Sequence, residues 1–335
     1  MTKFKTIKNG NDIDIPFIND DVLISEKLHS LSDGDLIIAD TAEDHSAGKT
    51  IELKNVGECK ILSGLHTIPL RPKQKCEIGF LGYYLNSNNY KQQIYPLIQG
   101  IKVYSISKSS LLHTYISTPS TEEQHKIANL LTKLDEYISV QNKIIKKYES
   151  LMNPIIEKLM REFKCNQYRL KDISQIKKGE QIGNTLLSSG GAYPMLNGGI
   201  SFSGNYTHFN RESNTIAISE GGNSCGYVSF IDKEFWAGGH CYTIHPKRKD
   251  PVFNRCLFYV LKKQENKIMT LRVGSGLPNI QKRDLENLLI NLPESSCISR
   301  FNTILGAIEE KIKIEKVIFS KLVLLKRYLL ANLFI

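Results

Sequence analysis

The chain has 335 residues and a formal net charge of +10, with 41% hydrophobic and 23% charged residues. This length suits two or three domains, and the composition is globular, which excludes a disordered or collagen-like chain. The first ten residues hold no apolar segment typical of a secretory signal, and the longest stretch without Asp, Glu, Lys or Arg is rich in Gly, Ser and Asn. We therefore expect a cytoplasmic protein with no membrane span. The seven cysteines form no Cys-x-x-Cys pair, which favours free thiols.

The positive charge is concentrated in one part of the chain. Residues 1–118 contain 13 Lys and Arg against 13 Asp and Glu, whereas residues 166–292 contain 16 against 10. A surplus confined to one segment indicates a polyanionic partner, most often nucleic acid. A basic solvated surface without a specific partner is the alternative interpretation.

The hydrophobic patterns predict an α+β protein that alternates between mixed domains and long helices. In the first domain, residues 35–39 are typical of a buried strand and residues 80–93 are more helical. In the second domain, residues 214–218 are typical of a buried strand, residues 226–231 and 240–245 of alternating strands, and residues 252–264 of a helix. The predicted domains are a first domain over 1–118, a helix over 119–165, a second domain over 166–292 and a helix over 293–335.

Both long helices follow a proline and carry candidate capping residues. Thr121 to Gln124 fits a capping box, and Ser295 or Ser296 is the candidate N-cap of the second helix. Pro154 lies inside the first helix, where it is expected to kink the helix or divide it near Asn153.

The chain is a tandem repeat with an offset of 174 residues. Pro119 matches Pro293, and Asp135-Glu136 matches Glu309-Glu310. The same offset reaches back into the preceding domains, where Gly64 and His66 match Gly238 and His240. Because the offset is shared by domains and helices, chance similarity of two amphipathic helices is a poor explanation.

Each helix carries apolar residues at steps of four and three, which predicts a pair of helices packed on each other. Gln141 and Glu315 occupy the same polar position in the two repeats, where such residues fix register or face solvent. Further apolar residues beside this stripe imply burial against helices of another chain. The candidate pairing and docking residues are Ile127, Leu131, Leu134, Ile138, Ile145, Tyr148, Phe301, Leu305, Ile308, Ile312, Phe319 and Leu322.

Cations and polar loop residues supply candidate DNA contacts, since Lys and Arg reach phosphates and Asn, Ser and Arg read base edges. Four Gly-Gly pairs, at 190–191, 198–199, 221–222 and 238–239, indicate tight turns or close backbone approach. For any one candidate, an ordinary loop residue is the competing interpretation. The candidates are Lys73, Lys75, Lys108, Lys177, Lys178, Asn205, Arg211, Asn223, Ser224, Lys247, Arg248, Lys249, Arg272, Lys282 and Arg283.

The motifs of the common enzyme classes are missing. The sequence has no Gly-x-x-x-x-Gly-Lys phosphate loop, no His-Glu-x-x-His and no Gly-x-Ser-x-Gly. Cys225, His240, Cys241 and His245 are zinc ligands by residue type, but their spacing matches no common zinc site. We therefore expect no catalytic residue and no metal site, and binding is the favoured class of function.

One segment resembles a known family. It runs through Gly100, the stretch Ile116-Ser-Thr-Pro119, and Glu123-Gln124 followed by the apolar heptads, and residues 274–293 form its second copy. This arrangement resembles the specificity subunit of type I restriction–modification enzymes over nearly the whole chain.

The resemblance implies two target-recognition domains in tandem, each followed by a long helix, with the helices paired as an antiparallel coiled coil. It implies a non-catalytic subunit that recognises a bipartite site in double-stranded DNA and docks two modification (methyltransferase) subunits. Restriction (translocase and nuclease) subunits would join the complex. S-adenosylmethionine, ATP and Mg would belong to those partner subunits.

Two departures from the repeat leave a second interpretation open. The segment 168–179 has no equivalent in the first half, so the first domain is expected to lack its opening strand. Cys297-Ile298 stands where the first helix has Glu123-Gln124. The alternative is therefore a truncated or silent specificity allele, a scaffold that reads only one half-site.

Overall fold

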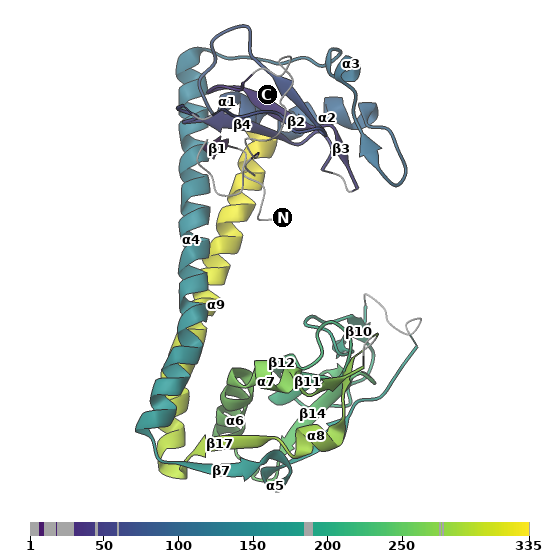
Figure 1. The fold of residues 1–335 in the computed structure, drawn as a ribbon, viewed down its shortest axis with the longest axis vertical. Coiled ribbons are helices and arrows are strands. Elements are labelled where there is room, and N and C mark those ends of the chain that lie inside the picture. The colour runs from purple at the N-terminus through teal and green to yellow at the C-terminus, as the bar shows by residue number, and fades with distance from the viewer. Residues whose placement is uncertain are drawn as a thin grey trace. The chain divides into compact units, whose positions relative to one another are not determined.

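A computed structural model describes residues 7–9, 18, 30–43, 46–58, 60–183, 190–274, 276 and 278–334. The chain divides into two compact units (Figure 1), unit 1 with residues 1–144 and 315–335, and unit 2 with residues 145–314. The predicted domain boundaries at 118, 165 and 292 stay predictions. Among the described helices, none combines the length and the apolar character needed to cross a membrane.

Unit 1 is built on a four-stranded sheet in the order β1-β4-β2-β5. β2 pairs antiparallel with both β4 and β5, and β1 pairs parallel with β4. The predicted strand 35–39 is confirmed as β2, and the predicted helical stretch 80–93 is two short helices, because the Ser87 side chain caps a new start by accepting from Tyr90 N. The elements are β1 (Ile7–Asn9), β2 (Leu36–Ala39), β3 (Thr41–Ala42), β4 (Thr50–Lys54), β5 (Thr67–Leu70), α1 (Phe80–Tyr84), α2 (Asn88–Ile94), η1 (Tyr95–Leu97), β6 (Tyr104–Ser105) and α3 (Lys108–Leu111).

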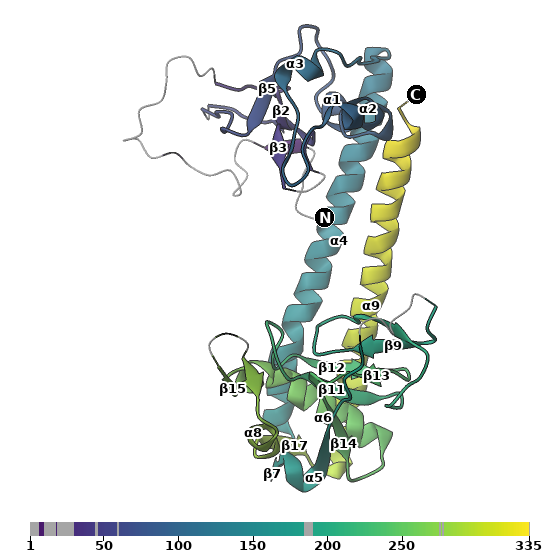
Figure 2. The ribbon, with the colours of Figure 1, turned by 90° about the vertical axis from the view of Figure 1, so that its right-hand side faces the viewer.

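Unit 2 holds an antiparallel sheet in the order β12-β11-β14-β8 and a three-stranded sheet in the order β10-β9-β13 (Figure 2). The three predicted strands and the predicted helix 252–264 are confirmed as β11, β12, β14 and α6. The elements are β7 (Cys165–Arg169), α5 (Leu170–Ile173), β8 (Ser174–Lys178), β9 (Tyr193–Leu196), β10 (Gly204–Tyr206), β11 (Thr215–Ser219), β12 (Val228–Ile231), β13 (Trp236–Ala237), β14 (Cys241–Pro246), α6 (Pro251–Lys263), α7 (Glu265–Met269), β15 (Arg272–Val273), β16 (Asn279–Ile280), α8 (Lys282–Glu286) and β17 (Leu289–Pro293).

The prediction that β14 alternates between buried and exposed residues is wrong. Cys241, Tyr242, Thr243 and Ile244 are all buried. β14 lies between β11 and β8, and its two faces contribute to different apolar clusters, Tyr242 and Ile244 to one and Cys241 to the other. A central strand that is covered on both faces has no solvent-exposed face, so burial does not alternate along it.

The two units share three strands and differ at the sheet edge. The order β4-β2-β5 corresponds in sequence to β12-β11-β14. In unit 2 a fourth strand, β8, pairs with β14 at one edge, whereas in unit 1 the fourth strand, β1, pairs with β4 at the opposite edge. Among the described residues of unit 1, no strand lies beside β5 where β8 lies beside β14.

The two long helices are α4 (Thr121–Glu162) and α9 (Ser295–Asn332). Thr121 is not the N-cap, because the helix begins there and the Ser120 hydroxyl accepts from Glu123 N at 3.3 Å. Gln124 instead binds outside the helix, donating to Pro119 O and accepting from Glu77 N. α9 likewise begins at Ser295, so Glu294 precedes it in the position predicted for a serine.

Pro154 does not divide α4, which continues unbroken from Thr121 to Glu162. A proline inside a helix removes one backbone hydrogen bond and costs about 3 kcal/mol. Packing on both sides of the proline offsets that cost. Met152, Ile155, Ile156 and Leu159 all belong to or pack against the main apolar cluster of unit 2.

Both long helices contribute to the core of each unit. In unit 1 the first part of α4 and the last part of α9 lie side by side (Figures 1 and 2), and Lys326 pairs with Asp135 at 2.6 Å. Gln141 donates to both the backbone carbonyl and the carboxylate of Glu315, so the two predicted polar positions meet each other. In unit 2 the cluster joins Ile156 and Leu159 of α4 to the following residues of α9: Ile298, Phe301 and Leu305.

The core of unit 1 is completed from near the end of the chain. The ring of Phe334 lies 5.9 Å from the Phe80 ring and 5.5 Å from the Tyr84 ring, measured between centroids. The Asn89 side chain also donates to the Phe334 carbonyl at 3.3 Å. Phe334, which lies 245 positions after Asn89 in the sequence, therefore packs against helices α1 and α2.

Candidate nucleic-acid interface

At one end of the main sheet of unit 2, the loops that follow β9, β11 and β13 meet Pro278 and the start of β16. Their close approach depends on glycine. A Cβ at Gly198, whose φ is +77°, would lie 2.5 Å from His240 O, and a Cβ at Gly238 would lie 2.4 Å from Asn197 Oδ1. Glycines of two Gly-Gly pairs thus allow polar loops to approach each other closely.

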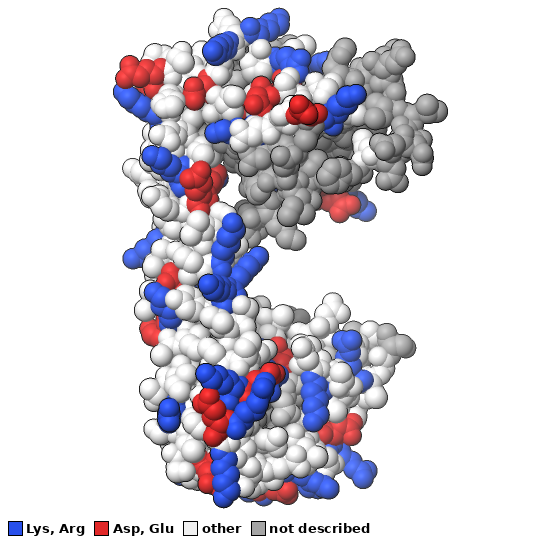
Figure 3. Space-filling view, turned by 60° about the vertical axis from the view of Figure 1, so that its left-hand side comes forward, with Lys and Arg blue, Asp and Glu red and all other residues white. Residues whose placement is uncertain are grey.

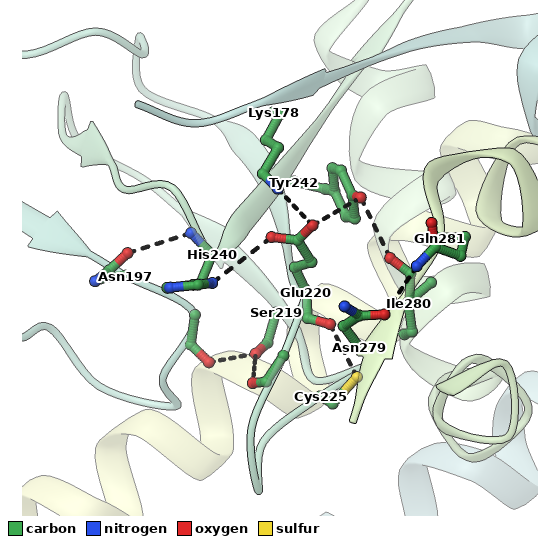
Figure 4. Close-up of polar contacts among 12 residues, drawn as sticks. Lys178, Asn197, Ser219, Glu220, Cys225, His240, Tyr242, Asn279, Ile280 and Gln281 are labelled. Carbon is green, nitrogen blue, oxygen red and sulfur yellow. Dashed lines mark hydrogen bonds and ion pairs between the residues drawn. The ribbon is translucent and has the colours of Figure 1, made fainter. Parts of the chain in front are cut away.

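Glu220, directly after β11, is the buried centre of this end of the sheet (Figure 4). Its Oε1 accepts from Lys178 Nζ at 2.6 Å and from the Tyr242 hydroxyl at 3.0 Å. Its Oε2 is buried without a hydrogen-bond partner and lies 3.8 Å from His240 Nδ1, on a side chain that is 65% exposed. Burial and the adjacent carboxylate both raise the pKa of Tyr242, so its hydroxyl keeps its proton and donates.

The segment Asn279–Gln281 is held against Glu220 at its middle residue. Ile280 N donates to Glu220 O at 2.8 Å, and Ile280 O accepts from the Tyr242 hydroxyl at 3.2 Å. The Ile280 side chain is fully buried, while Asn279 and Gln281 on either side of it are exposed. Gln281 Nε2 donates to Asn279 Oδ1 at 2.9 Å. Two amide side chains are therefore presented to solvent on an anchored backbone.

The structure brings together three of the residues predicted to contact DNA: Lys177, Lys178 and Arg211. Arg211 donates to Lys178 O at 2.8 Å, and to Thr243 Oγ1 and the Asn210 carbonyl. Its guanidinium therefore stabilises the fold locally. Lys177 is exposed, and Lys178 is 53% exposed although it pairs with Glu220.

Asn205, Asn223 and Ser224 occupy different surroundings. Ser224 Oγ donates to Gly198 O at 2.6 Å and so fastens two loops together. Asn223 is exposed next to it, and Asn205 is half-buried on β10 of the smaller sheet.

The remaining candidates are exposed cations on several elements. Arg248 pairs with Asp250 at 2.9 Å and Lys282 with Glu286 at 3.6 Å. The others in unit 2 are Lys247, Lys249, Arg272 and Arg283, and those in unit 1 are Lys73, Lys75 and Lys108. Figure 3 shows Lys and Arg interspersed with Asp and Glu over one face of unit 2, rather than gathered in a single patch. Their DNA contacts stay predictions.

Three cations line an open hollow on unit 2. Arg169, Lys171 and Arg283 surround a space of about 590 Å³ together with Glu286, Asn287 and Leu289. Arg169 and Lys171 were not among the predicted contacts. The hollow joins β7 and α5 to α8, which follows directly after Gln281.

The sequence also gave no indication of Glu220, Asn279 or Gln281. Glu220 is 42 residues after Lys178 and 60 before Ile280, and no motif links the elements that meet there. The available signals were the Gly-Gly pair that directly follows Glu220, and the repeat of His66 at His240 beside a second Gly-Gly pair. Glu220, Asn279 and Gln281 are brought close together by strand pairing, which their spacing in the sequence does not predict.

Metal ligation finds no support in the described part of the chain. Within it, no group of three or more His, Cys, Asp and Glu side chains is placed to hold a metal ion. Burial and the neighbouring Lys177 and Arg211 lower the pKa of His245 to about 4, so it is neutral near pH 7. Six cysteines are free, and Cys59 lies outside the described residues.

The long helices carry exposed apolar side chains beside their packed faces. None of the twelve predicted pairing and docking residues is exposed; each is buried or half-buried. Separate from them, in unit 1, Leu324 is 65% and Tyr328 is 64% exposed on α9, and Tyr137 is 65% exposed on α4. Which residues dock a partner stays a prediction.

The chain is similar to proteins of one kind in sequence. The family model described as Type I restriction modification DNA specificity domain matches residues 2–150 and 163–322. A Mycoplasma pneumoniae protein named as a type I specificity subunit is 39% identical over 126 residues, which cover 38% of this chain and 33% of that protein. A Methanocaldococcus jannaschii protein named as a type I restriction enzyme specificity subunit is 26% identical over 94% of this chain and 81% of its own length. The chain thus aligns with about a third of the Mycoplasma relative.

Solved structures show the same fold. A type I restriction–modification S subunit from M. genitalium superposes with a TM-score of 0.64 at 19% identity, covering 98% of this chain and 88% of that one. A chain from a structural study of complex assembly and conformational transition in the type I system gives a TM-score of 0.58 at 16% identity, covering 92% and 83%. Two tandem mixed domains with long helices are therefore a known architecture.

Proposed function

Because this chain belongs to the type I restriction–modification DNA specificity family, we propose that it is the non-catalytic subunit that selects the DNA sequence of such a complex. The observation that carries the proposal is the end of the unit 2 sheet, where Asn279, Gln281 and His240 are exposed around the buried Glu220. Amide and imidazole side chains on a fixed backbone are suited to hydrogen bonding with base edges.

The duplication supports a bipartite target. Each repeat supplies one mixed domain and one long helix, so the proposed target is double-stranded DNA with two half-sites separated by a gap. In this proposal α4 and α9 pair as an antiparallel coiled coil that sets the gap. The contacts of Gln141 with Glu315 and of Lys326 with Asp135 support such pairing.

The exposed apolar residues of the helices support docking of other subunits. Leu324 and Tyr328 are among the largest exposed side chains on α9, and exposed apolar surface of this kind is typical of protein interfaces. We propose that two modification subunits dock on the helices and that restriction subunits join the complex. S-adenosylmethionine, ATP and Mg would then belong to the partner subunits, in the cytoplasm.

A second candidate function is a scaffold that reads only one half-site. The observation in its favour is the edge of unit 1, where the described residues place no strand beside β5. The first domain is also net neutral, which weakens its attraction to phosphates.

Methylome sequencing of cells that carry this chain and its modification partner tests both candidates. A bipartite methylated motif with a fixed gap is the expected result. A motif confined to one half-site would favour the scaffold, and no methylation with a competent partner would contradict both.

A further inference from the structure

We propose that Asn279 contacts an adenine in the half-site read by unit 2, and that Gln281 positions the Asn279 amide for this contact. The inference rests on the proposed function and assigns its chemistry to a particular pair of residues. It starts from three facts: both amides are exposed, they bond to each other (Figure 4), and the residue between them is anchored.

The backbone between the two amides is fixed more firmly than a loop usually is. Ile280 is held through its N–H by Glu220 O, through its carbonyl by Tyr242, and through a side chain with no exposed surface. Two residues before Ile280, Pro278 O accepts from Gly222 N at 3.1 Å. Alternate residues of an extended segment point to opposite faces, so burial of Ile280 turns Asn279 and Gln281 outward together.

Asn279 retains the groups that recognise adenine. Adenine presents N7 as an acceptor and the N6 amino group as a donor in the major groove, and an asparagine amide matches both. An amide oxygen accepts two hydrogen bonds. The bond from Gln281 Nε2 uses one lone pair of Asn279 Oδ1, which leaves the other for N6–H, while Nδ2 remains free to donate to N7.

Gln281 acts through Asn279. Its donated hydrogen bond fixes which end of the Asn279 amide is oxygen, and this restricts the side-chain freedom that would otherwise be lost on binding. Gln281 is therefore a positioning residue, and Glu220 and Tyr242 support the same segment from below.

The charges near Asn279 favour a polyanion such as DNA over other ligands that could form hydrogen bonds with its amide. Arg272 is the strand partner of Ile280, and Arg283 follows Gln281 by two residues. Arg283 also lines the hollow that contains Arg169 and Lys171. Cations beside a base-reading group set the register of the duplex through its phosphates.

The test uses the complex of the full chain with its modification subunits and duplex oligonucleotides that carry the wild-type motif. Asn279→Ala is expected to lower the preference for adenine by about 5- to 150-fold at one position, the range for a bidentate base contact. The other positions and the other half-site should be unchanged. If the wild-type complex yields no motif, the proposed function fails; if it yields a motif that Asn279→Ala leaves intact, only this inference fails.

A modified base tests the contact directly. Replacing that adenine with 7-deazaadenine removes the N7 acceptor, and should weaken wild-type binding by about 2- to 12-fold, the range for one hydrogen bond. The Asn279→Ala complex should bind both duplexes equally. Equal sensitivity of variant and wild type to the modified base would overturn the assignment.

The positioning role of Gln281 requires non-additive effects. Gln281→Ala should reduce adenine preference at the same position and by less than Asn279→Ala, and the double variant should match Asn279→Ala. Additive effects, or loss at a different base, would contradict it. Gln167→Ala is the matched control, since this exposed amide bonds to Asn291 on the β7–β17 ribbon and should leave the motif intact. All three side chains are exposed, so thermal unfolding should stay close to wild type.

Discussion

The Tyr83 hydroxyl donates to Asp135 Oδ2 at 2.9 Å and ties helix α1 to α4 in unit 1. In unit 2 the same bond recurs between Tyr259 of α6 and Glu309 of α9, at 2.7 Å. Asp135 and Glu309 are the two acids that the repeat aligns. Their cations differ in origin, because Lys326 comes from the opposite long helix whereas Arg255 precedes Tyr259 on α6. The duplication has preserved the tyrosine–acid bond that fastens each domain to the helix that follows it.

Tyr83→Phe should lower the free energy of unfolding of the chain by about 1.5 to 3 kcal/mol, because it deletes a hydrogen bond to a charged acceptor. The ring stays packed, so the loss isolates the hydroxyl. Chemical denaturation followed by circular dichroism measures it. Tyr115→Phe is the control, as Tyr115 is 81% exposed and should change stability little. An equal loss in both variants would contradict the structural role.

Glu52 predicts a pH dependence in unit 1. Burial raises its pKa from 4.5 to about 7, although Gly79 N and Gly82 N donate to the carboxylate. The folded state therefore binds the proton more tightly than the unfolded state, so this contribution to stability is full below pH 4.5 and is lost as pH rises through about 7. The loss amounts to about 3 kcal/mol.

Glu52→Gln removes this titration, so its stability should change less than that of the wild type between about pH 5 and about pH 8. Thermal unfolding across this range gives the comparison. The slopes, rather than the absolute stabilities, carry the result, because glutamine offers only one acceptor for the two backbone N–H groups. Parallel profiles would show that Glu52 does not titrate in this range.

The exposed face of α9 should be required for docking. Leu324→Asp combined with Tyr328→Asp should abolish binding to modification subunits, because each would bury a charge in an apolar interface. Both residues are mostly exposed in the chain alone, so its own stability should be retained. Light-scattering mass of the mixed subunits is the measurement, with Leu112→Asp, on an 80% exposed residue outside the long helices, as control. A full-mass complex from the double variant would place docking elsewhere.

The basic hollow should contribute to the salt dependence of DNA binding. The slope of log affinity against log salt is negative. Arg283→Glu should reduce the magnitude of this slope by about 0.9 or more, since it removes one phosphate contact. The base preference should be unaffected, because phosphate contacts carry no sequence information. Lys267→Glu makes the same charge change at an exposed residue of α7 and should leave the slope nearly intact. Equal slopes for the two variants would exclude the hollow as a phosphate site.

Local patterns predicted the architecture well where they depended on neighbouring residues. Heptad spacing and flanking prolines located α4 and α9, and apolar runs located β2, β11 and α6. The N-cap of α4 differed by one residue, because both Ser120 and Thr121 can cap and only the helix start decides between them. Pro154 does not divide α4, and the sequence does not show the packing that offsets the cost of this proline.

The candidate interface was harder to predict because its residues meet through strand pairing. Arg211 looked like a base reader by type, yet Lys178 and Thr243 lie next to it across the sheet and accept its hydrogen bonds. Asn279 and Gln281 carry no motif, and their exposure is decided by the burial of Ile280 between them. Residue type thus indicates the chemistry of the interface, whereas non-local contacts decide which residues belong to it.

The contact of Phe334 with Phe80 and Tyr84 has a consequence for biosynthesis. A ribosome produces α1 and α2 long before α9, so the nascent amino-terminal domain must wait, with an apolar patch uncovered, until the closing aromatic emerges. The second domain packs against α4, which has already been made, and against the first part of α9, which follows it directly in the chain. The second domain would then complete its fold before the first. Chaperone dependence should be greatest for the half that is synthesised first.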